Sequence, residues 1–309
     1  MKDLIRIKEA EMFFTSFLKY TQSIFIDIME RNTLDMDSIA EKIKILWNEI
    51  QYNRRFLMYA KACIEPAHNE NYIAAHSVRA TVIAIMLGKY FKLPYYRLME
   101  LGTATLLHDI GMFKLPPDTY LNGLDLTAQK KQLIRSHPIL SHKILQPFKL
   151  PPAISLAVLE HHERENGSGY PKQLAGKDIS FYGKILAVAC SYEALLADRM
   201  YKKPKDAHTG VLELIKNEGY QYDTNIIRAL IFTFSIYPIG MFVLLSNGKQ
   251  GQVFDINPAS QHYPFIQLLE PTTKGESQII KTSNKGIYIA RPLLREEVHS
   301  EKTADHAYK

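Results

Sequence analysis

The chain has 309 residues, 46% hydrophobic and 23% charged, which allows roughly two domains and excludes an intrinsically disordered protein. Its formal net charge of +6 suits an anionic ligand, but the positive charges are dispersed, so we expect neither DNA nor RNA as a partner. Two distant cysteines, Cys63 and Cys190, exclude a disulfide framework and favour the reducing cytoplasm.

Residues 1–65 are predicted to form an N-terminal helical region, because apolar side chains such as Phe13 and Phe17 recur every three or four positions. A break at Asn32-Thr33 and a candidate N-cap within residues 35–38 divide this region into two helices. The first residues mix both signs of charge, which excludes a secretory signal. We expect this region to pack on the main domain, to associate with a second copy or to contact a signalling partner, in preference to forming a ligand-sensing module.

Residues 66–237 are predicted to form an all-helical domain that carries most of the histidines. His76 lies on a helix with an apolar face, where a single histidine is more often a core residue than a ligand. His108 shares a helical face with Leu98 and Leu101, and Gly111 is expected to end that helix. Asp109 then stands near a helix C-terminus, where a carboxylate is unfavourable and therefore informative.

The next segments bring further histidines. We expect a helix over residues 126–145 that Pro138 interrupts, with His137 as the functional histidine and His142 on the surface. A helix opening at residues 151–152 carries His161 on its apolar face. Adjacent helical residues point about 100° apart, so His161 and His162 serve one centre only if the helix ends there.

A long apolar helix over residues 182–196 leads into a cationic cluster that contains Arg199 and Lys202, which suits a phosphate although such a cluster is more often a solvated helix end. The uncharged run over residues 229–246 approaches the length of a membrane span, but Pro238 and Gly240 interrupt it and we expect no span. Residues 238–294 are predicted to form a small β extension, with strands at 242–245, 252–256, 265–269, 278–281 and 286–290 and a turn at Asn247-Gly248. Residues 295–309 are polar and expected to be disordered.

The histidines and one carboxylate together indicate a metal centre. Six such ligands are too many for one tetrahedral ion, but they suffice for two ions that share Asp109. Two metal ions about 3.5 to 4 Å apart are the usual device for displacement at phosphorus. Nitrogen and carboxylate donors favour iron, manganese or zinc. The candidate ligands are His76, His108, Asp109, His137, His161 and His162.

The order of these motifs closely resembles the HD-GYP domain of the HD phosphohydrolase superfamily. The matching residues are His76, then His108-Asp109-Ile110-Gly111, then His137-Pro138, then His161-His162-Glu163, then Gly169-Tyr170-Pro171. The resemblance covers roughly residues 71–237 and continues to Asn247-Gly248 and Gly251. It implies an all-helical domain that holds two or three metal ions, often iron or manganese, and hydrolyses cyclic di-GMP to pGpG or GMP.

The resemblance also implies roles for individual residues. The five histidines and Asp109 would be metal ligands, with His108 and Asp109 at the catalytic centre. Arg199 and Lys202 match positions that face the nucleotide phosphate, while Gly169, Tyr170 and Pro171 form the loop that shapes the pocket.

Three positions depart from the family pattern. Met112 stands where the family usually has a lysine, and Lys114, two residues further on, is a candidate to replace it. Cys190 stands where the family has an aspartate ligand, so it either coordinates as a thiolate or leaves one metal ion under-coordinated. Tyr72 stands where members with three metals have a glutamate, which favours two divalent transition metal ions.

Three functional hypotheses follow. The first is a cyclic di-GMP phosphodiesterase in which a metal-bridging hydroxide attacks phosphorus. The second is a degenerate domain that binds cyclic di-GMP or a partner protein without turnover, which Met112 and Cys190 favour. The third is an HD phosphohydrolase for another nucleotide, which the Gly169-Tyr170-Pro171 loop argues against.

Overall fold

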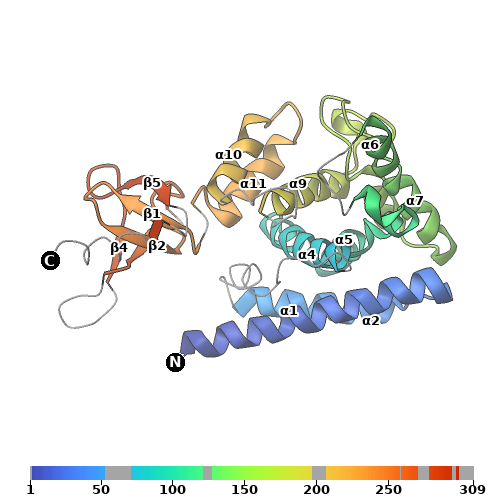
Figure 1. The fold of residues 1–309 in the computed structure, drawn as a ribbon, viewed down its shortest axis with the longest axis horizontal. Helices are drawn as coiled ribbons and strands as arrows, with labels where there is room; N and C mark the ends of the chain where they lie inside the picture. The colour runs from blue at the N-terminus through green and yellow to red at the C-terminus, as the bar shows by residue number, and fades with distance from the viewer. Residues whose placement is uncertain are drawn as a thin grey trace. The chain divides into compact units, whose positions relative to one another are not determined.

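The computed structural model describes residues 2–52, 71–120, 127–196, 207–237, 239–257, 259–270, 278–293 and 297–298 (Figure 1). They fall into two compact units. The first comprises Met1–Pro204 with Leu214–Ala229, and the second comprises Lys205–Glu213 with Leu230–Lys309. The predicted architecture is confirmed, because the chain is mainly helical and ends in a small antiparallel sheet.

In the part of the N-terminal region that the structure describes, residues 2–52, the chain forms two helices. α1 (Lys2–Ile26) runs into a π-helical turn, η1 (Asp27–Arg31), and Asn32 ends it in the left-handed conformation with φ 51°. α2 (Met36–Tyr52) is capped at its N-terminus because the Asp35 carboxylate accepts a 2.9 Å hydrogen bond from the Ser38 amide. α1 packs on α4 (Tyr72–Tyr90) and α2 packs on α5 (Tyr95–Leu107), so the region covers the helical core of the first unit.

The helical core is built from α4 (Tyr72–Tyr90), α5 (Tyr95–Leu107), α8 (Pro152–Glu160) and α9 (Phe181–Leu196). α4 packs on α5 and α9, and α8 packs on α5 and α9. Nearly every residue of α4 between Ile73 and Gly88 is buried, since neighbouring helices cover it on more than one side. His76 is therefore placed deep in the core.

The segment over residues 126–145 differs from the prediction. It forms two helices, α6 (Ala128–Ile134) and α7 (His137–Leu145), that meet at Arg135 and Ser136. Pro138 does not interrupt a helix but lies in the first turn of α7, where a missing backbone N–H costs no hydrogen bond. The break thereby puts His137 at a helix start.

Short helical turns and two further helices complete the helical part of the described residues. The turns are η2 (Ile110–Lys114), η3 (Pro117–Thr119), η4 (Gln146–Phe148) and η5 (Gly176–Asp178), and the helices are α10 (Ala207–Lys216) and α11 (Thr224–Phe234). Across the described ranges, no helix combines the length and the apolar character that a membrane crossing requires.

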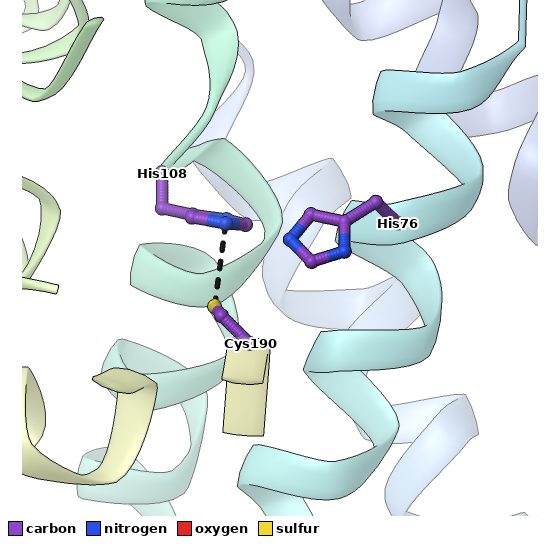
Figure 2. A group of neighbouring side chains, drawn as sticks. All are labelled: His76, His108 and Cys190. Atoms are coloured by element: carbon purple, nitrogen blue, oxygen red, sulfur yellow. Dashed lines mark hydrogen bonds between the residues drawn. The ribbon is translucent and has the colours of Figure 1, made fainter. Parts of the chain in front are cut away.

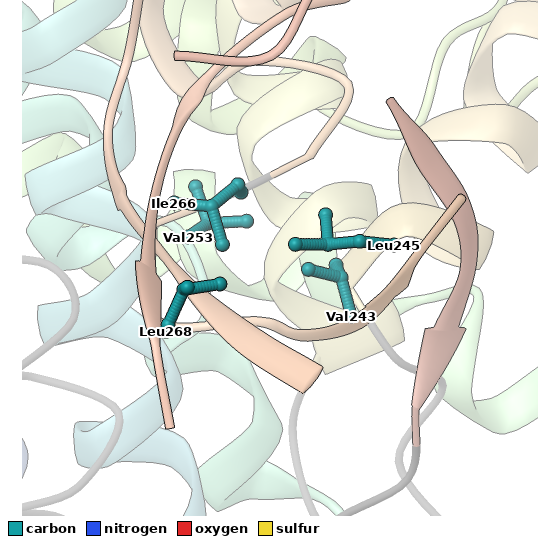
Figure 3. Packing of buried hydrophobic residues seen from close by; sticks show 5 residues of the cluster. All are labelled: Val243, Leu245, Val253, Ile266 and Leu268. Atoms are coloured by element: carbon teal, nitrogen blue, oxygen red, sulfur yellow. The ribbon is translucent and has the colours of Figure 1, made fainter. Parts of the chain in front are cut away.

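The strand-rich C-terminal part forms one antiparallel sheet with the strand order β4-β3-β2-β1-β5. Its strands are β1 (Phe242–Leu245), β2 (Gln250–Asp255), β3 (Phe265–Leu268), β4 (Ile279–Lys281) and β5 (Ile289–Leu293). Alternating residues of β1, β2 and β3 point to one side and form a core of Val243, Leu245, Val253, Ile266 and Leu268 (Figure 3). The predicted turn lies at Gly248, whose φ of 79° suits a glycine.

Candidate metal centre

Four helices bring the six predicted ligands together. His76 projects from α4, His108 and Asp109 follow the end of α5, His137 opens α7, and His161 with His162 follows α8. Helix α8 ends at Glu160, so it meets the centre at its end, as the adjacent histidines require. The site is interior, because His108 and His161 have exposed fractions of 0% and 1%.

The imidazoles form two donor groups, which a third, overlapping group of His108, Asp109 and His161 connects. His76 and His108 lie with Cys190 in the first donor group, and His137, His161 and His162 form the second donor group. In each group the candidate ligand atoms lie within 4.8 Å of one another.

The Asp109 carboxylate lies between the two donor groups. Its Oδ2 is 3.4 Å from His108 Nε2 and 3.6 Å from His76 Nε2. Its Oδ1 is 3.1 Å from His137 Nε2 and 3.5 Å from His161 Nε2. Each oxygen thus faces a different donor group, which is the arrangement that a carboxylate shared by two cations needs.

Backbone carbonyls set the tautomer of three of these histidines. The Nδ1 atoms of His108, His137 and His161 lie 2.7, 2.6 and 2.8 Å from the carbonyl oxygens three residues earlier. A carbonyl only accepts, so Nδ1 carries the proton and donates it, and Nε2 keeps a lone pair directed at Asp109. Metal-binding histidines are usually oriented in this way.

The lone pairs of the site therefore face one another. His137 Nε2 and His161 Nε2 are 3.0 Å apart, yet in the tautomers that the backbone carbonyls select neither ring has an Nε2 proton to donate. For the same reason the buried Asp109 Oδ1 accepts no hydrogen bond although His137 is close. Converging donors without a proton between them require a cation, so these residues fit divalent metal ions.

Burial keeps three of the histidines neutral. It lowers the pKa of His108 to about 3, and it also lowers the pKa of His161 and His162. Burial alone would raise the pKa of Asp109, but the positive charge that His108 or His137 carries when it is protonated holds the pKa of Asp109 well below its usual range. Neutral imidazoles beside an ionised carboxylate are the protonation states that metal coordination needs.

Cys190 belongs to the first donor group (Figure 2). Its Sγ lies 3.3 Å from His108 Nε2, and since His108 donates through Nδ1, the thiol must donate to Nε2. Burial and the charges of Asp109 and Glu193 raise the thiol pKa well above its usual value. In the absence of a cation, Cys190 is therefore a neutral thiol that points at the coordination position.

The structure adds Glu193, which the sequence reasoning missed. This buried carboxylate accepts hydrogen bonds from His76 Nδ1 and from Arg79 Nε. It orients the His76 ring so that Nε2 faces Asp109, as an outer carboxylate commonly does for a metal-bound histidine. A carboxylate three residues after Cys190 on a largely apolar helix was the available signal.

The Gly169-Tyr170-Pro171 loop closes one side of the second donor group. A Cβ on Gly169 would lie 2.5 Å from the His162 carbonyl oxygen and from Arg164 N, so only glycine allows this approach. The Tyr170 ring consequently stacks on His162, with centroids 4.6 Å apart and planes at 19°. Glu163 holds the loop, because its buried carboxylate accepts from the amides of Lys172 and Leu174.

Of the three cationic residues predicted to bind the substrate, the structure describes only Lys114. Lys114 is exposed on η2, and Met112 before it is buried. Arg199 and Lys202 lie outside the described residues. Sequence reasoning also missed Arg135, whose guanidinium lies over the Tyr170 ring at 5.1 Å from the centroid.

Comparison with known proteins decides the family. The family model described as "HD domain" matches residues 59–226, more than half of the chain. The chain belongs to the HD domain family. Within that family, the resemblance to the HD-GYP domain is confirmed.

The HD domain chain is similar to two curated proteins and one solved structure over most of its length. It is 29% identical over 229 residues to cyclic di-GMP phosphodiesterase PdeB of Borreliella burgdorferi, covering 72% of this chain and 60% of that protein. It is 32% identical over 201 residues to cyclic di-GMP phosphodiesterase PA4108 of Pseudomonas aeruginosa, covering 65% of this chain and 48% of that protein. The fold matches Bd1817, an HDG"Y"P protein from Bdellovibrio bacteriovorus, with a TM-score of 0.59, 19% identity and coverage of 73% of this chain and 71% of that chain.

Proposed function

We propose that this chain is a metal-dependent phosphodiesterase that hydrolyses cyclic di-GMP to pGpG, GMP or both. The observation that carries the proposal is the position of Asp109, whose two oxygens face two separate donor groups. The names of the curated relatives support the substrate class, as does the Gly169-Tyr170-Pro171 loop. The chain spans 60% and 48% of the lengths of those relatives.

The first donor group would hold one divalent ion and the second donor group the other, with Asp109 shared and iron or manganese as the favoured metals. Two such ions supply Lewis acidity and lower the pKa of an attacking water. The protein's own part is positional. Glu193 orients His76, the backbone carbonyls orient three further histidines, and Glu163 holds the loop that carries Tyr170.

The test is to purify the protein anaerobically, count metal ions per chain, and follow cyclic di-GMP conversion with iron or manganese. We expect two ions per chain and the release of pGpG or GMP. The His161→Ala, His162→Ala double variant should lose metal and activity together, since it removes two of three ligands of the second donor group. His142→Ala is the matched control, because His142 lies on α7 outside both donor groups. Unchanged metal content in the double variant would contradict the proposed metal centre.

The alternative is a degenerate receptor that binds cyclic di-GMP without turnover. Two observations favour it: Cys190 is a neutral thiol in the first donor group, and Met112 is buried where the family has a lysine. Loss of one positioned cation can cost on the order of 100-fold in rate. Full metal occupancy with micromolar binding and no conversion would establish the receptor and refute the phosphodiesterase.

A further inference from the structure

Arg135 lies at the junction of α6 and α7, two residues before His137. Its amide donates to the Lys131 carbonyl at 3.0 Å, so the backbone of Arg135 still belongs to the last turn of α6. Ser136 then turns the chain into α7. The guanidinium is thereby carried beside the second donor group by two helices rather than by a free loop.

A stack of three side chains fixes where this guanidinium points. His162 stacks on Tyr170 with ring centroids 4.6 Å apart, and Arg135 Cζ lies 5.1 Å from the same Tyr170 centroid. The Tyr170 ring is also 6.4 Å from the His137 ring. Arg135 is therefore connected to two histidines of the second donor group through one aromatic ring.

The charge of Arg135 is not neutralised in the described part of the chain. The side chain is exposed, and no carboxylate of the described residues lies within ion-pair distance of it. An aromatic face attracts a guanidinium but satisfies none of its five N–H donors. Those donors remain available to an oxygen ligand.

The neighbouring Arg164 is not equivalent. Its Nη1 donates to the Glu163 carbonyl at 2.8 Å and to the His161 carbonyl at 3.4 Å, and its guanidinium lies over Tyr222. Arg164 is thus committed to holding the backbone that carries the histidines. Of these two arginines, only Arg135 has a guanidinium whose N–H groups are free to bind a phosphate.

We propose that Arg135 is a substrate-binding residue that donates hydrogen bonds to a phosphate oxygen of the bound cyclic dinucleotide. This inference rests on the proposed function for the nature of the substrate. The ligand class follows from the guanidinium, whose paired N–H donors match the oxygens of a phosphate group. Arg135 thereby supplies a cation on the Tyr170 side of the centre. The lysine that the family usually has at position 112 is replaced in this chain by the buried Met112.

The test compares Arg135→Ala, Arg135→Lys and Lys131→Ala in the metal-loaded, full-length protein. Lys131 is the matched control, because it is an exposed cation on the same helix α6. For Arg135→Ala we expect KM for cyclic di-GMP to rise about 10- to 100-fold, the range for a charged hydrogen bond, with kcat largely unchanged. Arg135→Lys should recover part of the loss, since it restores charge but not the paired N–H donors.

Three further readouts separate binding from a structural role. Metal content and the urea midpoint of Arg135→Ala should equal those of the wild type. The wild-type KM should also rise with ionic strength more steeply than that of Arg135→Ala, because salt screens the lost attraction. If Arg135→Ala behaves like Lys131→Ala, the inference is wrong and the proposed function stands.

Equilibrium binding of cyclic di-GMP tests the inference even without turnover. If the wild type binds but does not convert cyclic di-GMP, the proposed function fails, and weaker binding by Arg135→Ala than by Lys131→Ala still supports Arg135. Wild-type protein that neither converts nor binds cyclic di-GMP would overturn both.

Discussion

The two donor groups differ in one ligand atom, because the first contains the sulfur of Cys190 where the second has a third imidazole nitrogen. His137, His161 and His162 offer three imidazoles, whereas His76 and His108 are joined by the Cys190 thiol. The thiol donates its proton to the His108 nitrogen that a metal would use, and burial opposes loss of that proton. Metal binding at the first donor group must therefore displace the thiol proton of Cys190. A carboxylate at position 190 would already be ionised and would have no such proton to lose.

Cys190→Asp is predicted to raise metal occupancy and turnover. The carboxylate is ionised at neutral pH and is a harder donor for iron or manganese, so we expect at least about a tenfold increase in cyclic di-GMP conversion. Metal counting and steady-state kinetics under anaerobic conditions measure both effects. Cys190→Ser is the control, because it keeps the size without adding a carboxylate. Equal turnover in all three proteins would show that residue 190 does not limit activity.

At the scale of elements, the centre depends on how closely η2 approaches α7. The Gly111 amide donates a 2.8 Å hydrogen bond to Ser141 Oγ on α7. A Cβ on Gly111 would lie 2.3 Å from the His137 carbonyl oxygen and 2.4 Å from Ser141 N, which are backbone atoms that cannot rotate away. This contact sets the distance between Asp109 and His137.

Gly111→Ala is predicted to separate η2 from α7 and to destabilise the protein by about 3 kcal/mol, the upper end for overpacking. Metal affinity should fall as well, since Asp109 and His137 move apart. Urea unfolding and metal titration measure these effects. Gly176→Ala serves as the comparison: its φ of 51° costs about 1–2 kcal/mol, but its Cβ meets no atom within 4 Å and metal affinity should persist. Similar metal affinity in the two variants would argue against the spacing role of Gly111.

The loop after α8 is a second element whose position depends on one side chain. Glu163 accepts from Lys172 N at 2.7 Å through one oxygen and from Leu174 N at 2.9 Å through the other. Both oxygens are needed because the two amides belong to different residues of the loop. The Tyr170 ring is thereby held against His162.

Glu163→Gln is predicted to loosen this loop, because the amide group that replaces one oxygen cannot accept. We expect a loss of about 1–3 kcal/mol for the unsatisfied buried amide. Hydrogen exchange should rise at residues 168–174, as measured by mass spectrometry on the folded protein. Asp178→Asn removes a charge from an exposed residue of the same segment and should leave exchange unchanged. Equal protection in wild type and Glu163→Gln would contradict the anchoring role.

For the molecule as a whole, the buried histidines link stability to pH in metal-free protein. Folding lowers the pKa of His108 to about 3 and also lowers that of His161 and His162, whereas the unfolded chain has pKa values of about 6.5. Below pH of about 6.5 the unfolded state binds more protons than the folded state. The free energy of unfolding must then fall as the pH is lowered.

Chelator-treated protein is predicted to lose about 1.4 kcal/mol of unfolding free energy through His108 between pH 7.5 and 5.5, with a further loss through His161 and His162. Urea unfolding at the two pH values measures the difference. His108→Gln should show a smaller pH dependence than the wild type, and His142→Ala should show the same dependence as the wild type. A flat profile in the wild type would mean that these histidines take up protons in the folded state as readily as in the unfolded chain.

Periodicity and motif order were enough to predict the helical domain, the small β extension and the six candidate ligands. Apolar residues repeat with a helical or strand period because each element buries one face, so these patterns are local and readable. The break before His137 was not predicted, because Pro138 is compatible both with a kink and with a first turn. Arg199 and Lys202 remain predictions.

The sequence by itself therefore determined which candidate metal ligands exist, in what order they occur along the chain, and on which kind of element each one lies. Only the tertiary structure decided that Asp109 faces two donor groups, that Glu193 orients His76, and that Arg135 reaches the Tyr170 ring. These relations join residues far apart in the chain, and they depend on helix ends and glycine contacts that bring backbones together. Spacing along one helix carries no information about such distances, since they are set by packing between helices.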